Sequence, residues 1–224
     1  MDPCFISIGP TCVPAEILKA GQLRKCSYGF DWARSGSHHL RDFLQLNHEV
    51  FMQKHIYTPS VPLTQPVDPS TSILNTVEPE AYSPLYGYPY YYNPHRNLYL
   101  EETHDYLDRC FFRTREVFEN HNRKKILILA DYINKAGAIF LNKTGLISEY
   151  LDDLFGSRKD IICLIIRMEL TQSYAPEPFC LIEDRRTNVS LMKFKFCAAL
   201  DDPRLRHRIY KKIGKYILGC NQMS

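Results

Sequence analysis

The chain has 224 residues, of which 45% are hydrophobic, and its formal net charge is +3. This length allows a single large domain with a substantial core, and so small a charge does not by itself indicate nucleic-acid binding. No apolar run reaches the length of a membrane span. The first residues lack the basic and apolar segments of a signal peptide, so we expect a chain without one.

The eight cysteines are spread through apolar segments and form no C-x-x-C pair. The sequence therefore predicts no zinc site and no other metal or cofactor. In a chain of this length, cysteines so distributed favour reduced thiols over a disulfide scaffold. We therefore expect a cytoplasmic protein.

The first elements are a short apolar strand over residues 5–8 and a helix over residues 13–20, separated by Gly-Pro-Thr. Cys12 stands at the junction, where backbone N–H groups and the helix dipole lower the pKa of a thiol and favour the thiolate. The N–H groups around Thr11 and Val13 are placed to hold an oxyanion. Cys12 is therefore a candidate nucleophile, although a cysteine is more often a small, inert core residue.

Asp31 lies between Phe30 and Trp32. A carboxylate between two large aromatic residues is expected to be partly buried and must then find a hydrogen-bond donor. It could orient a histidine, cap a helix, or bind an arginine such as Arg34. A helix is predicted over residues 38–46, after Ser37 as its N-cap.

Apolar periodicity is lost over residues 57–94, which contain eight prolines and a second half rich in tyrosine. A loop this long is either functional or disordered, and its tyrosine content argues against a simple linker. It could fold over a site, with Tyr90 and Tyr92 contacting a ligand, or form a polyproline-like strap across the surface. The sequence leaves both alternatives open.

Regular structure resumes near His104, with strands alternating with helices. Helices are predicted over 106–120, 146–155 and about 203–218, and strands over 126–130, 161–166, 179–182 and 189–196. Continuous apolar strands between helices predict an α/β fold with a mostly parallel central sheet flanked by helices. We expect one domain over residues 1–224, with residues 57–94 as an insertion. The basic side of the last helix is typical of a solvated face, so nucleic acid is not an expected partner.

His104 is the histidine best placed to act as a base, because it stands where the insertion ends and the core resumes. Asp131 follows the strand 126–130, and ligands of open α/β sheets gather beyond the carboxyl ends of strands. Either Asp31 or Asp131 could therefore orient the base. The sequence contains no phosphate-binding loop, G-x-G-x-x-G, H-E-x-x-H or G-x-S-x-G motif.

Residues 5–12 (FISIGPTC) and 23–32 (LRKCSYGFDW) resemble a family of unknown function described as papain-like cysteine peptidases, with members in bacteria and large DNA viruses. The family pattern is a strand, Gly-x-x-Cys, a short helix and Ser-x-Pro-Phe-Asp-Trp, followed later by Asn-x-Tyr and His-Asp elements. The resemblance is strong over residues 5–46, weaker over 97–131, and slight beyond. It implies Cys12 as nucleophile and His104 as base. Gly29 stands where the family has proline.

Our leading hypothesis is a cysteine-dependent hydrolase, either a papain-like peptidase or an acyl transferase, that acts on a peptide or other acyl substrate. In it Cys12 attacks the carbonyl, His104 carries the proton and Asp31 orients His104. Residues Trp32, Tyr90 and Tyr92 would contact the substrate. The alternatives are an α/β enzyme acting on a glycan or a nucleotide-linked sugar, and a catalytically inert viral interaction protein. The sequence allows a homo-oligomer, in the host cytoplasm if the chain is viral.

Overall fold

A computed structural model describes residues 2–8, 12–33, 35, 37–57, 91, 93, 96, 98–133, 144–171, 179–185, 189–197 and 203–222. Its strands are β1 (Cys4–Ser7), β2 (Lys125–Ile133), β3 (Ile161–Thr171), β4 (Phe179–Arg185) and β5 (Val189–Cys197). Its helices are α1 (Val13–Ala20), α2 (Ser37–Gln45), α3 (His48–Met52), α4 (Glu101–Glu119), α5 (Thr144–Phe155) and α6 (Pro203–Gln222), with one π-helical turn, η1 (Gln53–Tyr57).

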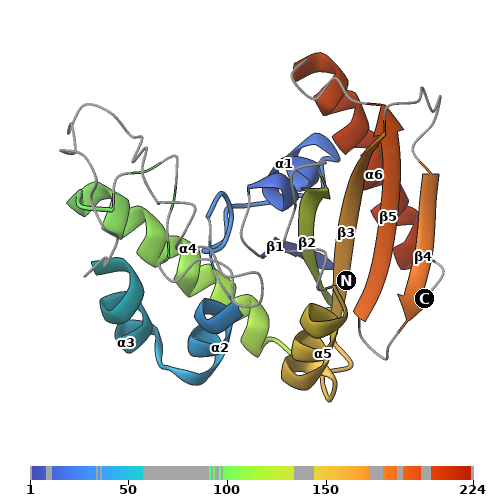
Figure 1. Cartoon of the computed structure of the whole chain (residues 1–224). Coiled ribbons are helices and arrows are strands. Elements are labelled where there is room, and N and C mark those ends of the chain that lie inside the picture. The colour runs from blue at the N-terminus through green and yellow to red at the C-terminus, as the bar shows by residue number, and fades with distance from the viewer. Residues whose placement is uncertain are drawn as a thin grey trace.

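The five strands form one sheet in the order β1-β2-β3-β5-β4. Strands β1, β2, β3 and β5 are parallel, and β4 pairs antiparallel with β5. The arrows of the parallel strands point upward in Figure 1, so their carboxyl ends share the upper edge of the sheet. This topology confirms the prediction of an α/β fold with a mostly parallel central sheet.

Alternate residues of the inner strands build two cores, one on each face of the sheet. In β2, Ile126, Ile128 and Ala130 join the core formed with α1 and α6. Leu127 and Leu129 join the other core, which packs against α2–α5. Because both faces are covered, the inner strands are apolar throughout, as parallel strands generally are.

Several elements extend further than the sequence pattern predicts, and two of them, α4 and β2, carry candidate site residues. Helix α4 begins at Glu101 rather than 106, and its first turn carries Glu101 and Glu102, whose charges suit the positive end of the helix. His104 therefore lies inside the helix rather than at its boundary. Strand β2 continues to Ile133, so Asp131 lies within it, opposite Arg167 of β3, rather than beyond its end.

The sequence pattern did not predict α3 and η1. Helix α3 is short, and it starts because the Asn47 side chain accepts a hydrogen bond of 2.8 Å from the Val50 N–H. Most of the predicted insertion, residues 58–90, lies outside the described residues. Near its end, Tyr91 is buried and donates a hydrogen bond of 2.6 Å to the Gly29 carbonyl.

Helices α1 and α6 meet at two glycines. A Cβ on Gly214 would lie 2.6 Å from the Gly21 Cα, and a Cβ on Gly21 would lie 2.9 Å from the Gly214 Cα. The two backbones can approach this closely only because both residues lack a side chain. Among the described helices, none is long and apolar enough to cross a membrane.

Candidate functional site: a basic pocket at the carboxyl end of β1

The segment after α1 is held between the sheet and α4 by an aromatic core (Figure 1). The Phe30 ring packs edge-on against Phe111 of α4 and Phe43 of α2, at centroid distances of 5.2 and 5.5 Å. The Gly29 N–H donates a hydrogen bond of 2.9 Å to the Thr114 hydroxyl. A Cβ on Gly29 would overlap the Phe111 ring, so this turn fits glycine and not the proline of the family pattern.

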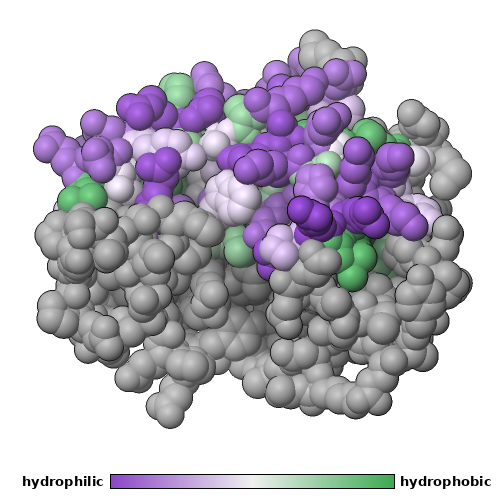
Figure 2. Space-filling view, turned by 90° about the horizontal axis from the view of Figure 1, so that it is seen from above, coloured by the Kyte–Doolittle hydropathy of each residue, from purple (hydrophilic) through white to green (hydrophobic). Residues whose placement is uncertain are grey.

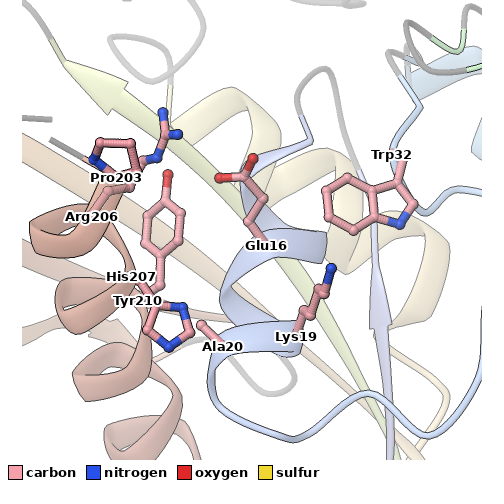
Figure 3. A pocket seen from close by; sticks show the side chains of 8 residues that line it. All are labelled: Glu16, Lys19, Ala20, Trp32, Pro203, Arg206, His207 and Tyr210. Carbon is pink, nitrogen blue, oxygen red and sulfur yellow. The ribbon is translucent and has the colours of Figure 1, made fainter. Parts of the chain in front are cut away.

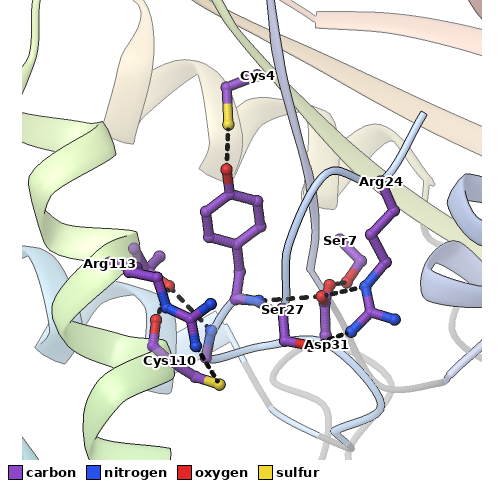
Figure 4. Close-up of polar contacts among 10 residues, drawn as sticks. Cys4, Ser7, Arg24, Ser27, Asp31, Cys110 and Arg113 are labelled. Atoms are coloured by element: carbon purple, nitrogen blue, oxygen red, sulfur yellow. Dashed lines mark hydrogen bonds and ion pairs between the residues drawn. The ribbon is translucent and has the colours of Figure 1, made fainter.

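Asp31 is buried at the carboxyl end of β1, where Ser7 and Arg24 point toward it (Figure 4). Its carboxylate accepts hydrogen bonds from the Ser7 hydroxyl, from Arg24 Nε at 2.8 Å and from the Tyr28 N–H at 3.0 Å. Of the partners considered for this carboxylate, the structure therefore shows an arginine. That arginine is Arg24, whereas Arg34 lies outside the described residues.

Arg24 is fixed in place by this carboxylate. Its Nη2 also donates a hydrogen bond of 2.5 Å to the Ser27 hydroxyl. Its guanidinium lies 5.5 Å from the centre of the Trp32 ring, and Lys19 Nζ lies 5.8 Å from the same ring. Trp32 has a φ of 62°, which is uncommon for a bulky residue and which the surrounding contacts must maintain.

Arg24 and Trp32 line a pocket of about 360 Å³ with residues from three other segments. Its described lining residues are Lys19, Arg24, Ser27, Trp32, Asn93, Arg96 and Tyr106, and we call this site the basic pocket. Three of these described side chains are cations, and none of them is a carboxylate. The Arg96 guanidinium lies over the Tyr106 ring at 3.6 Å. Neither Lys19 nor Arg96 forms an ion pair with any described residue.

Cys12 is the N-cap residue of α1, as the sequence predicts, and its thiol is reduced and partly exposed. Its carbonyl accepts a hydrogen bond of 3.1 Å from the Glu16 N–H. Burial raises the pKa of three other cysteines, Cys4, Cys110 and Cys163. Val13 begins the helix and is buried, while Thr11, Tyr90 and Tyr92 lie outside the described residues.

His104 lies in the first turns of α4. Its Nε2 donates a hydrogen bond of 2.6 Å to the Leu98 carbonyl, and its ring lies 5.1 Å from that of Tyr57. Helix residues two positions apart do not face the same way, and Tyr106, not His104, lines the basic pocket. The structure joins Asp31 to Arg24, and it joins His104 to Leu98 and Tyr57.

The arrangement suits anion binding. Lys and Arg side chains bind phosphate or carboxylate oxygens through charge-assisted hydrogen bonds, and aromatic faces stack on rings. Within the described residues, no group of three or more His, Cys, Asp or Glu side chains is arranged to hold a metal ion.

Sequence reasoning placed Arg24 and Trp32 in a motif but missed Lys19, Asn93, Arg96 and Tyr106 as site residues. Comparison of the chain with protein-family models, with curated proteins and with solved structures finds no match in any of the three. The pocket itself therefore carries the functional argument.

Proposed function

We propose that this chain binds a small phosphate-bearing ligand with a ring, of the kind found in phosphorylated or nucleotide-linked sugars, in the basic pocket. The observation that carries the proposal is the convergence of Lys19, Arg24 and Arg96 around two aromatic rings, with no carboxylate among the described lining residues. This is the second of the functions that the sequence suggests.

The charges of the pocket support an anionic ligand. Asp31 balances one positive charge, that of Arg24, from beneath the pocket. The contacts of Lys19 and Arg96 within the described residues are with aromatic rings, which leave their charges available. Lys19 and Arg96 lie in the same pocket as Arg24, which Asp31 already orients. Three such cations form a strong binding site for phosphate oxygens.

The position of the pocket supports a ligand site as well. Asp31 accepts a hydrogen bond from the hydroxyl of Ser7, the last residue of β1, and it also accepts one from Arg24. Both contacts lie at the edge of the sheet where the parallel strands end. Open α/β sheets bind their ligands outside the carboxyl ends of their strands. Seen from above, the described part of this end of the molecule is mainly hydrophilic, with scattered hydrophobic residues (Figure 2).

Calorimetric titration with uridine diphosphate glucose, guanosine diphosphate mannose and glucose 1-phosphate tests the proposal. We expect at least one of them to bind, and Arg96→Ala to weaken that binding by about tenfold or more, the value of one charge-assisted hydrogen bond. Arg109→Ala is the matched control, because Arg109 is an exposed arginine of α4 outside the pocket lining. The proposal is wrong if none of the three compounds binds, or if Arg96→Ala leaves the affinity unchanged.

A second candidate is the cysteine-dependent hydrolase implied by the family resemblance, and the partly exposed Cys12 thiol at the N-terminus of α1 favours it. In this function Cys12 attacks an acyl carbonyl. His104 accepts the thiol proton at Nδ1, the basic nitrogen of the ring, because its Nε2–H donates to the Leu98 carbonyl. A thiol-directed covalent probe should label the wild type and Cys26→Ala, whose lost thiol is also partly exposed, but not Cys12→Ala. Equal labelling of all three proteins would exclude this candidate.

We also infer a cytoplasmic location. In the described part of the chain, Cys4, Cys12, Cys26, Cys110 and Cys163 form no disulfide, and cysteines used in this way are typical of proteins from a reducing compartment.

A further inference from the structure

A second pocket adjoins the basic pocket across Trp32 (Figure 3). It has a volume of about 250 Å³. It lies along the N-terminal half of α6 and beside the face of α1 that carries Ala20. Its lining consists of Glu16, Lys19, Ala20, Trp32, Pro203, Arg206, His207 and Tyr210, and we call it the helix pocket. Lys19 and Trp32 line both pockets.

The meeting of α1 and α6 explains why a pocket forms here. The helices touch at Gly21 and Gly214, where the backbones are in contact. Every lining residue that α1 and α6 contribute precedes these glycines in its own helix. The helix pocket therefore occupies the space on the N-terminal side of the crossing, with Trp32 as its opposite wall (Figure 3).

The two pockets differ in chemistry. The described residues of the basic pocket include three cations and no carboxylate, whereas those of the helix pocket combine the Glu16 carboxylate with the imidazole of His207 and the hydroxyl of Tyr210. Glu16 is half-buried and forms no ion pair with a described residue, although Lys19 and Arg206 line the same pocket. Its oxygens therefore remain available as acceptors.

A carboxylate acceptor beside an aromatic face suits a hydroxyl-rich ring. The carboxylate accepts hydrogen bonds from hydroxyl groups and repels phosphate, while the apolar face of a sugar ring can pack on Trp32. We infer that the helix pocket is the sugar subsite of a two-part ligand whose phosphate lies in the basic pocket and whose linkage crosses Trp32 beside Lys19. This inference rests on the proposed function.

The test compares sugar-bearing compounds with their sugar-free counterparts. The pairs are uridine diphosphate glucose with uridine diphosphate, guanosine diphosphate mannose with guanosine diphosphate, and glucose 1-phosphate with inorganic phosphate. We expect Glu16→Gln to lower the affinity for the sugar-bearing compound of the bound pair by about tenfold, because a charged acceptor for hydroxyl groups is lost. The same variant should leave the sugar-free member unchanged or slightly tighter, because it removes a negative charge near Lys19.

Two further variants complete the design. His207→Gln changes an exposed residue of the same pocket, and it should lower the affinity for the sugar-bearing compound but not for its sugar-free counterpart. Glu116→Gln, on the exposed side of α4, is the control and should change neither affinity. If Glu16→Gln and His207→Gln weaken both members equally, or neither, the sugar subsite is disproved and the phosphate site stands. If no compound of any pair binds, or if Arg96→Ala weakens neither member of a bound pair, the proposed function fails first.

Discussion

Two buried networks of charge lie at opposite ends of the parallel sheet, and they differ in where their charges face. At the amino end, Asp160 precedes β3 and holds two cations. Lys125 Nζ, fully buried, lies 2.6 Å from its Oδ2, and Arg158 Nη2 lies 2.8 Å from the same atom. Lys125 and Arg158 also donate hydrogen bonds to the carbonyls of Asn120 and Phe118.

At the carboxyl end, Asp31 holds only one cation, Arg24. That arginine lines the basic pocket together with Lys19 and Arg96, whose positive charges no described carboxylate pairs. The amino-end network directs its donors into the protein and joins β2, β3 and α4. The carboxyl-end network positions a cation that faces a pocket. The comparison teaches that the end of the sheet at which we propose ligand binding differs from the other end by cations that no described carboxylate pairs, and not by having a buried ion pair.

The largest effect is expected from breaking the amino-end network. Asp160→Ala leaves Lys125 buried without its counterion, and we expect the free energy of unfolding to fall by about 3–5 kcal/mol. Urea denaturation measures this loss. The control is Asp153→Ala, because Asp153 is an exposed aspartate of α5. A loss no larger than that of the control would mean that the network contributes nothing.

Breaking the carboxyl-end network should cost less stability but should also affect binding. In Asp31→Asn the amide oxygen can still accept from Arg24 and Tyr28, but the negative charge that pairs with Arg24 is lost and an NH₂ group faces the Ser7 hydroxyl, so we expect a loss of about 1.5–3 kcal/mol. Because Arg24 is then held less firmly, the affinity for the phosphate compound should fall as well, whereas Asp160→Ala should leave it unchanged in the folded protein. Equal effects of the two substitutions on affinity would remove the distinction between the two ends.

The helix crossing offers a way to perturb the pocket side while touching neither network. Gly214→Ala forces the α1 and α6 backbones apart, and we expect a loss of about 1–3 kcal/mol in urea denaturation. Gly219→Ala lies in the same helix with open space around its Cβ, and it should instead stabilise the protein by about 0.5–1 kcal/mol. If both substitutions changed the free energy of unfolding in the same direction, the close approach of the two backbones at Gly214 would be contradicted.

The smallest expected effect is the change with pH in the free energy of unfolding. Hydrogen bonds from Arg158, and then from Lys125, hold the pKa of Asp160 well below its ordinary value. A folded-state pKa below the unfolded one means that the stabilisation is complete above about pH 4 and is lost as the pH falls through the lower folded value. In urea denaturation at pH 6 and pH 3, Asp160→Asn should therefore differ from the wild type more at pH 6. A constant difference would contradict the lowered pKa.

The sequence predicted the fold class because the inner strands are buried on both faces and alternate with amphipathic helices. It placed Cys12 at the junction of β1 and α1, because a strand, a turn and a short helix are local signals, and it predicted the burial of Asp31 from the two large aromatic residues beside it. It did not predict how the side chains pair across the fold. The basic pocket joins Lys19 to Arg96 and Tyr106, which are far away in the sequence and meet only after α4 packs on the segment that carries Phe30. His104 was misplaced at a boundary because α4 starts earlier, at Glu101.

The Phe111 ring occupies the volume that any side chain at position 29 would need. Residues 29 and 111 should therefore covary among relatives of this chain. A relative with proline at the first position should carry a smaller residue at the second, and it should not need a hydroxyl where Thr114 now accepts the Gly29 N–H. Proline and phenylalanine together at these two positions would require α4 to shift away from the turn, and the pocket wall at Tyr106 would move with it.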